Sequence, residues 1–556
     1  MNYRINKNGE TLLESIYNNR NLTDEYIDEL LNSTTWEDTF NYKNMEKGCD
    51  LLDKVISEGG EIGIVIDCDV DGYTSGAIIY SWIYDYLGYD DVYYIIKNQS
   101  KKSHGIDKEV IRKVDNNEMS LIILPDGGSS DFEYQEELYK MGCEVLVLDH
   151  HEFDTTKETK ATIINNQDGV VENTKLSGAG VTYKFVFHHA ERKGIDLGTT
   201  FLDLVAVSLI SDMCDMTSME NRYIFSVGSQ VSNISNELLT EFVKDLKVKR
   251  KLSIENIAFG VANRMNSIIR LGDEERFDMF ESLIGSEEQV SYKYKGKEYQ
   301  QSIQASILRV ANRLKQKQKK MVEKCMTGGL DIMTSENDRI LIVNGMDIDS
   351  EIRGLLANKL LSEYGVPVMI LKEYNGVLRG SCRGVNSISF KDLLERSGMF
   401  NYVEGHQNSF GCSINKDKVD ELISYVNKEL LGVDLSSSTD VDYVYEGNIP
   451  LNDVIALGEL DDLWCNQIKR PKILVKNVRI NSNDINKKGI DMNFKVGGVL
   501  FKRDFCSKVF YEDLVCFENN SNIDKDLNIN MICEVKSFEN GRSYINIVEF
   551  ESCLDN

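Results

Sequence analysis

Short apolar runs that alternate with helix-length segments constrain the fold of this chain more than any other feature. The runs lie at residues 61–66, 91–96, 119–124 and 144–148, and the segments between them have the length and polarity of helices. Alternation of strand and helix is typical of a mainly parallel sheet with helices on both faces. The sequence therefore predicts an α/β fold.

Longer-range patterns divide the chain into five regions. Ile303, Ile307, Val310 and Leu314 share one face of a predicted helix, and short alternating runs after residue 437 are typical of a small β-barrel. We expect a helical lead-in at 1–57, an α/β domain at 58–298, a connecting helix at 299–328, a smaller α/β domain at 329–436 and an OB-like β-barrel at 437–556.

The charge balance excludes a protein that coats DNA with its whole surface. Lys and Arg number 63 and Asp and Glu number 90, so the net charge is −27 and phosphates would be repelled. A local basic channel and a carboxylate metal site both remain compatible with this charge. The basic residues of the predicted connecting helix fit either a solvated face, the commoner case, or contact with a polyanion; they are Arg313, Lys315, Lys317, Lys319 and Lys320.

Several patterns bear on the compartment. No apolar run reaches the roughly 18 residues that a membrane span needs, and the first residues lack the apolar core of a secretory signal. The 12 cysteines are scattered singly, which indicates reduced thiols rather than disulfides or a zinc site. We therefore expect a cytoplasmic protein that does not bind a membrane.

Acids and histidines follow three of these apolar runs, at 61–66, 119–124 and 144–148, and one later apolar run that ends at Asp212. They are Asp67, Asp69, Asp71, Asp126, Asp149, His150, His151 and Asp212. In an open α/β sheet the carboxyl ends of the strands meet at one edge, where ligands bind. Oxygen ligands mixed with imidazole suit Mn²⁺ or Mg²⁺, and this set is large enough for two ions.

Each motif taken alone also has an ordinary structural explanation. An Asp after a strand is commonly a turn or cap residue, and neighbouring histidines commonly lie at the surface or in the core. An EF-hand calcium loop is disfavoured because its twelfth position would be Ile78. The combination of four such motifs is what favours a metal centre.

The ordered motifs DCDVDG, PDGG, DHH and SLISD resemble the phosphoesterase motifs of the DHH superfamily. The resemblance implies two manganese ions, with magnesium as the alternative. Asp69 and Asp71 would each hold one ion, Asp126 would bridge them, and His150 and Asp212 would complete the ligand shell. Asp67 would occupy the place of a histidine found in other branches. Asp149 would orient a histidine, and His151 would face the scissile phosphate.

Further segments resemble the RecJ single-strand exonuclease branch over nearly the whole chain. The segment 259–273 resembles a RecJ stretch carried here by Arg264, Asn266 and Arg270, while GSCRG and EGHQNSFG resemble signatures of the DHH-associated domain. Guanidinium groups suit backbone phosphates. The resemblance implies that a terminal phosphate is captured by Ser381 and Arg383, with His406, after Gly405, as a donor near the metals.

This chain departs from the RecJ pattern on the substrate side. Gly384 replaces a serine, Glu404 replaces a glycine, and Asn408 and Ser409 stand where two alanines are usual. Every metal position is filled. The sequence therefore supports phosphodiester chemistry better than it supports a particular strand polarity.

The predicted function is a manganese-dependent exonuclease that degrades single-stranded DNA from the 5′ end to mononucleotides in DNA repair, recombination or replication. Two alternatives stay open: a phosphodiesterase of short oligonucleotides or cyclic dinucleotides, and a non-catalytic replication scaffold. The expected partners are single-stranded DNA and a single-strand-binding, replication or recombination protein. The Asn- and Lys-rich character suits a bacteriophage or an AT-rich bacterial source, with the cytoplasm of the bacterium, or of the host of a phage, as the compartment.

Overall fold

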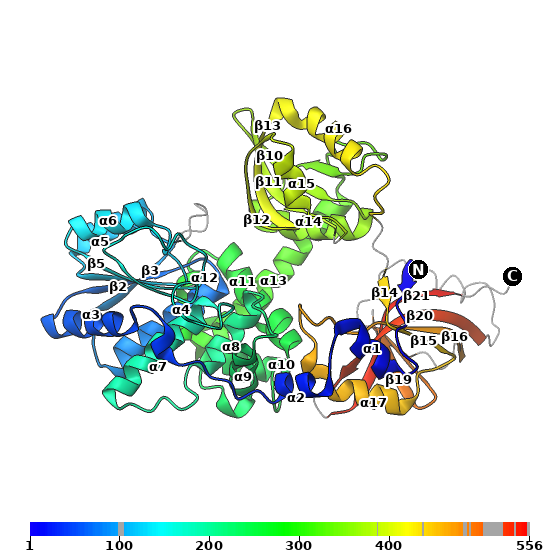
Figure 1. Cartoon of the computed structure of the whole chain (residues 1–556), viewed down its shortest axis with the longest axis horizontal. Helices are drawn as coiled ribbons and strands as arrows, with labels where there is room; N and C mark the ends of the chain where they lie inside the picture. The colour runs from blue at the N-terminus through cyan, green and yellow to red at the C-terminus, as the bar shows by residue number, and fades with distance from the viewer. Residues whose placement is uncertain are drawn as a thin grey trace. The chain divides into compact units, whose positions relative to one another are not determined.

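The chain forms two compact units. The computed structural model (Figure 1) describes residues 1–97, 105–385, 387–435, 439–481, 486–488, 491–503, 526–538 and 541–552. The smaller unit comprises Met1–Ile5 and Arg313–Val441, and the larger unit comprises Asn6–Asn312 and Asp442–Asn556. Among helices in the described ranges, none combines the length and apolar character needed to cross a membrane.

A five-stranded parallel sheet forms the first part of the larger unit. Its strand order is β3-β2-β4-β5-β6, and every neighbouring pair is parallel. The strands are β2 (Ile62–Ile66), β3 (Val92–Ile96), β4 (Leu121–Pro125), β5 (Glu144–Asp149) and β6 (Thr162–Asn165). All residues of β2, β4 and β6 are buried, as expected for strands covered on both faces. The predicted α/β fold is confirmed.

Helices cover both faces of this sheet. One face packs α5 (Lys108–Asn117) and α6 (Phe132–Lys140) against alternate strand residues such as Ile122 and Leu124. The other face packs α3 (Met45–Glu58), α4 (Val70–Ser81) and α7 (Gly178–Lys193). Successive side chains point to opposite faces of the sheet, so a continuous apolar strand contributes side chains to the cores on both faces.

A helical block follows the sheet, and a β-hairpin interrupts it before the long helix. The helices are α8 (Leu202–Ser211), α9 (Met219–Gly228), α10 (Glu237–Leu246), α11 (Asn263–Leu271) and α12 (Glu275–Leu283). The hairpin strands are β7 (Gln289–Tyr294) and β8 (Lys297–Ser302). The long helix α13 (Ile303–Thr327) thus begins at Ile303, not at residue 299. Lys295 and Gly296, both with positive φ, form the tight turn that the sequence analysis overlooked.

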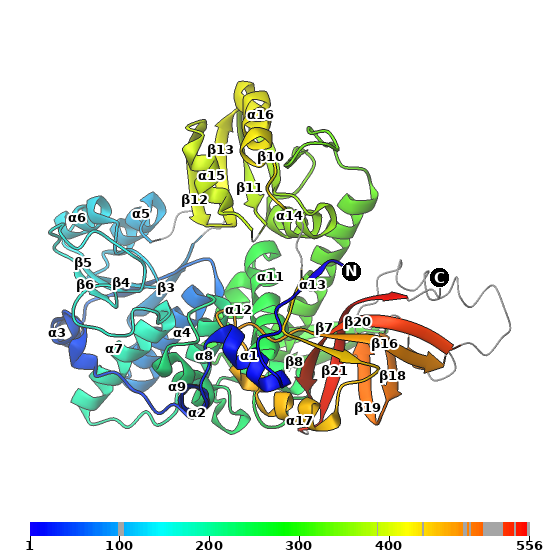
Figure 2. The same ribbon diagram turned by 45° about the vertical axis from the view of Figure 1, so that its right-hand side comes forward.

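The C-terminal part of the larger unit is a curled mixed sheet (Figure 2), consistent with the expected OB-like domain. Its strand order is β15-β16-β20-β21-β19-β18-β17. The strands are β15 (Tyr443–Glu446), β16 (Ile473–Asn481), β17 (Asn486–Lys488), β18 (Asp491–Val496), β19 (Val499–Arg503), β20 (Asp526–Ser537) and β21 (Ser543–Ser552), with helix α17 (Leu451–Glu459). The N-terminal helices α1 (Leu12–Arg20) and α2 (Asp24–Leu31) share its core, since Leu12 and Leu30 cluster with Val475.

The smaller unit is built on a second sheet with strand order β12-β13-β11-β10-β9. Its strands are β9 (Leu341–Asn344), β10 (Val368–Tyr374), β11 (Val377–Arg383), β12 (Phe400–His406) and β13 (Ser409–Asn415). Helices α14 (Ser350–Tyr364), α15 (Phe390–Arg396) and α16 (Val419–Glu429) enclose its two apolar cores. Strand β1 (Tyr3–Ile5) pairs in parallel with β14 (Thr439–Val441).

Candidate metal centre

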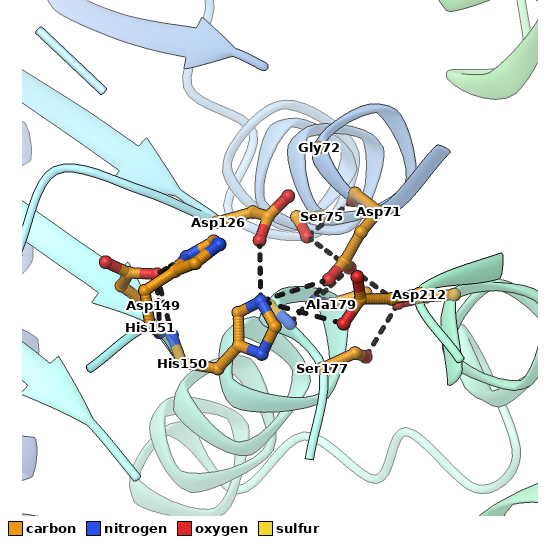
Figure 3. Close-up of polar contacts among 12 residues, drawn as sticks. Asp71, Gly72, Ser75, Asp126, Asp149, His150, His151, Ser177, Ala179 and Asp212 are labelled. Carbon is orange, nitrogen blue, oxygen red and sulfur yellow. Dashed lines mark hydrogen bonds and ion pairs between the residues drawn. The ribbon is translucent and has the colours of Figure 1, made fainter. Parts of the chain in front are cut away.

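The strand-end acids gather at the carboxyl edge of the parallel sheet (Figure 3). Asp67 follows β2, Asp69 is the N-cap of α4, and Asp71 lies in the first turn of that helix. Asp126 follows β4, and Asp149 is the last residue of β5. Parallel strands place these ends side by side, which is why residues far apart in sequence meet. Asp212 joins them from the C-cap of α8.

The histidine of the third motif links the acids. His150 Nε2 lies 3.2 Å from Asp126 Oδ1, 3.7 Å from Asp71 Oδ2 and 3.9 Å from Asp212 Oδ2. Three groups have potential ligand atoms within 4.8 Å of one another: Asp126 with Asp149, His150 and His151; Asp71 with His150 and Asp212; and Asp67 with Asp69 and Asp126. Asp126 and His150 each belong to two groups, which suits a site for two ions.

Asp71 is fixed by donors from two other elements. Its carboxylate accepts hydrogen bonds from the backbone N–H groups of Gly178 and Ala179, each at 2.8 Å, and from Ser208 Oγ at 2.5 Å. The two amides are at the N-terminus of α7, where unpaired N–H groups and the helix dipole favour an anion. Gly178 is required there because a Cβ would lie 2.5 Å from Asp126 Oδ1.

Asp126 has the chemistry of a metal ligand. It is 2% exposed and has a positive φ of 66°; its buried Oδ1 accepts no hydrogen bond from the described residues, although His150 Nε2 lies 3.2 Å away. Burial raises the pKa of Asp126 well above its usual range, and the charges of Asp71 and Asp69 raise it further. A buried carboxylate oxygen without a donor is costly unless a cation binds it. The donor set therefore fits a divalent ion.

Asp69 experiences the same repulsion. Burial, followed by the charges of Asp71 and Asp67, raises the pKa of Asp69 to about 7. Its Oδ1 accepts a hydrogen bond from Gly72 N at 2.9 Å, which opposes that shift only in part. The clustered acids thus repel one another when no cation is bound, and divalent cations would remove this repulsion.

Asp149 holds the two histidines in place. Its Oδ1 accepts from the backbone N–H of His150 at 2.7 Å and lies 2.8 Å from His151 Nδ1. Although burial opposes ionisation, the hydrogen bond to His151 lowers the pKa of Asp149 to about 2. The same bond raises the pKa of His151 to about 9. His151 is therefore cationic at neutral pH, and its side chain is 54% exposed.

Three polar residues that the sequence analysis did not single out support the histidine loop. Asn165 Nδ2 donates to His151 O at 3.0 Å and to Ser129 Oγ at 2.9 Å. Gln167 Nε2 donates to His150 O at 3.1 Å. Asn165 and Gln167 belong to the polar segment NNQDG at residues 165–169. A polar run directly after a buried strand was the available signal.

The loop after Asp212 is held by the C-terminal part of the larger unit. Gln467 Oε1 accepts from Met216 N at 3.2 Å, and its Nε2 donates to Cys214 O at 3.5 Å. Arg222 is buried and donates to Met216 O, Asp462 O and Leu463 O. These contacts connect the loop after Asp212 to a segment about 250 residues away in sequence. No local sequence motif indicates them.

The predicted DNA-contact residues of α11 have different surroundings. Arg264 forms an ion pair with Asp245, and Asn266 is half-buried. Arg270 has an exposed side chain. Loss of hydration around its guanidinium lowers the pKa of Arg270, and the negative charge of Asp69 raises that pKa. Of the two arginines, Arg270 is thus the one whose charge reaches the acid cluster.

The predicted end-binding residues meet on the second sheet. Arg383 of β11 pairs with Ser409 of β13, and Ser409 pairs with His406 of β12, so the three residues form one row across three strands. Ser381 lies two residues before Arg383, and Gly405 has a φ of 127°. The side chain of His406 lies outside what the structure describes.

Two of the departures from the family pattern compensate each other. A Cβ at Gly384 would lie 2.4 Å from Asn408 Oδ1. That oxygen accepts from Phe390 N at 3.0 Å, at the start of α15. The amide of Asn408 thus fills the space that a side chain at position 384 would need.

The fold and the site together define a metal-binding α/β protein with the acid constellation of a phosphoesterase. Residues 61–209 match the family model of the DHH family, N-terminal domain. A putative SPbeta prophage-derived single-strand DNA-specific exonuclease, YorK of Bacillus subtilis, is 29% identical over 95% of this chain and 93% of that protein.

Proteins named RecJ are also similar to this chain. The single-stranded-DNA-specific exonuclease RecJ of Bacillus subtilis is 24% identical over 79% of this chain and 53% of its own length. The crystal structure of RecJ from Thermus thermophilus in complex with Mn²⁺ aligns with 98% of this chain and 76% of that chain, with a TM-score of 0.70 and 17% identity. Residues 61–209 thus match the DHH family, and the relatives that resemble this chain over most of its length are named as single-strand-specific exonucleases.

Proposed function

We propose that this protein is a metal-dependent exonuclease that hydrolyses single-stranded DNA from the 5′ end and releases mononucleotides. The observation that carries the proposal is the convergence of acids and His150 from four separate segments on one edge of the sheet. The names of its relatives support the substrate, since YorK and RecJ are both named as single-strand-specific exonucleases.

The residues of the centre would divide the work of holding two ions. Asp69 and Asp71 would each hold one ion, Asp126 would bridge both, and Asp67, His150 and Asp212 would complete the shell. Mn²⁺ is favoured because the mixed carboxylate and imidazole set suits it and because the Thermus thermophilus RecJ structure is a Mn²⁺ complex; Mg²⁺ is the alternative. When bound, two such ions supply charge neutralisation and a lowered pKa for water in an in-line displacement.

His151 would contact the phosphate from the solvent side. Its Nδ1 is held by Asp149, which fixes the orientation of the cationic ring, and a cationic imidazole suits a phosphate oxygen. Asp149 acts as a positioning residue because it orients the ring and stabilises its charge. Arg264, Asn266 and Arg270 would bind the phosphates that follow, and Ser381, Arg383, Gly405 and His406 would bind the 5′ end.

A basic face of α13 supports binding of a single strand. Arg313, Lys317, Lys320 and Lys324 are exposed and, with Gln316 and Met321, line a surface hollow of about 470 Å³. Their spacing places them along one side of the helix. In a chain with a net charge of −27, this local concentration of positive charge favours the polyanion interpretation over a solvated face.

The two alternative functions differ from this proposal in what they require. A scaffold does not need metal ligands, yet every ligand position is filled and the side chains converge. A phosphodiesterase of short oligonucleotides would not need the basic face of α13 or the OB-like sheet. We propose a cytoplasmic site of action, and a single-strand-binding, replication or recombination protein as partner in DNA repair or recombination.

The test is hydrolysis of end-labelled DNA by the purified protein with Mn²⁺ or Mg²⁺. We expect mononucleotide release from the 5′ end of a long single strand, little hydrolysis of duplex, and no reaction in EDTA. Labels at opposite ends fix the direction. Faster hydrolysis of a dinucleotide than of the long strand would favour the short-substrate alternative, and no hydrolysis of any substrate would favour the scaffold.

A further inference from the structure

The β7–β8 hairpin is an exposed element with an unusual aromatic face. Its two strands form a two-stranded sheet of their own. Tyr292 and Tyr299 are directly opposite in the register, and their rings stack with centroids 5.5 Å apart and planes inclined by 24°. Isolated hairpins gain little from burial, so this face is not explained by a core.

An arginine extends the aromatic pair. The guanidinium of Arg309, on α13, lies over the ring of Tyr292, 3.5 Å from its centroid. Tyr299 remains 42% exposed although it stacks on Tyr292. The arrangement is a layered Arg309–Tyr292–Tyr299 stack with an aromatic ring open to solvent. Planar groups of this kind accept a further planar ring.

The charge of the hairpin favours an anionic partner. Its strands and turn carry three exposed lysines, Lys293, Lys295 and Lys297, against a single acid, Glu298. This excess of positive charge is set in a strongly acidic chain. Phosphates beside bases would satisfy both the lysines and the open ring, whereas an acidic peptide would leave the ring without a planar partner.

We propose that the β7–β8 hairpin is a stacking platform for single-stranded nucleic acid, with Tyr299 contacting a base and the hairpin lysines contacting the flanking phosphates. The proposal rests on the proposed function and deepens it, since it assigns a base-contacting element outside the metal centre. Stacking on aromatic rings is blind to sequence, so the platform would hold any unpaired base and reject duplex, whose bases are already stacked.

The experiment measures equilibrium binding in EDTA, where no hydrolysis occurs. Fluorescence anisotropy compares a labelled oligothymidylate with an abasic strand of the same length, which has the phosphates without the bases. The parent protein should prefer the oligothymidylate. Tyr299→Ala should weaken oligothymidylate binding by roughly tenfold and leave abasic binding unchanged, whereas Tyr299→Phe should retain the parent affinity.

Tyr93→Ala is the matched control, because Tyr93 is a similarly exposed tyrosine, at 46%, on strand β3. It should bind both strands like the parent. Equal affinity of Tyr299→Ala and the parent for oligothymidylate would overturn the inference, as would a Tyr299→Ala change in oligomeric state on size exclusion, which would assign the hairpin to a protein contact. Hydrolysis with Mn²⁺ is scored separately, so an inactive parent that still needs Tyr299 for binding would refute the proposed function alone.

Discussion

The metal centre and the sheet row that carries Arg383 differ in how their polar side chains are held. In the centre, Asp71 accepts bonds from two amides and two hydroxyls, and Asp149 from three amides and an imidazole. In the row, Arg383 donates to the carbonyl of its neighbour Cys382 and lies against Gly354. Backbone amides from other elements fix the acids of the first site, whereas the second presents half-buried side chains along a strand.

The difference follows from what each site would bind. Buried carboxylates close together repel one another and need fixed geometry and a cation, so few substitutions are tolerated there. A row of half-buried side chains that binds a phosphate can adjust when the residues around it are substituted. The departures from the RecJ pattern, such as Gly384 and Asn408, lie in the second region and not in the first.

The largest expected effect is that of Asp126→Asn. Asparagine tolerates the positive φ of this position and preserves the shape of the side chain, while it removes the charge that would bridge two ions. Because metal assistance supplies several kcal/mol, kcat should fall by roughly a thousandfold or more, measured as mononucleotide release with Mn²⁺. Asp154→Asn, an exposed acid in the loop after His151, should retain activity. Near-parent turnover by a folded Asp126→Asn protein would contradict the bridging role.

Asp149→Asn should have the next largest effect. The variant retains an oxygen acceptor but loses the charge that stabilises cationic His151, so activity should fall by about 10- to 100-fold. The parent should lose activity as the pH rises through about 9, where His151 gives up its proton. In Asp149→Asn that loss should begin at lower pH. An unchanged pH profile would show that Asp149 supports the loop without controlling the imidazole.

Arg383→Ala should have a smaller and more selective effect. One charge-assisted contact to a terminal phosphate corresponds to roughly tenfold in affinity. The preference for a 5′-phosphate over a 5′-hydroxyl end should therefore disappear, while hydrolysis at the metal centre continues. Arg379, an exposed arginine on the same strand, provides the control variant Arg379→Ala. Equal hydrolysis of both ends by the parent protein would remove Arg383 from the end-binding site.

The smallest effect concerns stability without metal. The folded-state pKa of Asp69 is about 7 against an ordinary value of 3.8, so protonated Asp69 favours the folded state at low pH. This contribution is lost as the pH rises from about 4 to about 7. In EDTA the melting temperature should therefore fall over this window, and less so in Asp69→Asn. Mn²⁺ should restore stability at pH 7 in the parent; a flat profile in EDTA would argue against repulsion among the acids.

Much of the fold was predictable because its periodicities are local. Four of the five strands of the parallel sheet were predicted from short apolar runs, and β2, β4 and β5 lead directly into the acids, so these strands and the edge that binds ligands followed from pattern alone. The hairpin at 289–302 was not predicted, because Lys, Gln and Tyr at alternate positions gave no apolar signal. Its turn at Lys295–Gly296 was the only cue.

The support of the site was less predictable than its ligands. Gln467 and Arg222 reach the loop after Asp212 through contacts between segments that are distant in sequence. Gly178, Ala179 and Ser208 hold Asp71 from two helices, yet nothing in their local sequence marks them as its partners. The packing of α1 and α2 into the core of the C-terminal sheet was likewise hidden, since an amphipathic helix shows that it has a partner but not which one.

The sequence by itself determined which side chains carry the chemistry, because acids at the ends of buried strands are expensive unless they bind something. Tertiary structure alone decided how those acids are charged and aimed. Burial in the folded chain is the largest cause of the raised pKa of Asp69, and the surroundings of Asp126 Oδ1 come from segments that lie tens of residues apart in sequence. Burial and electrostatic repulsion act through space, and only the folded chain sets that spacing.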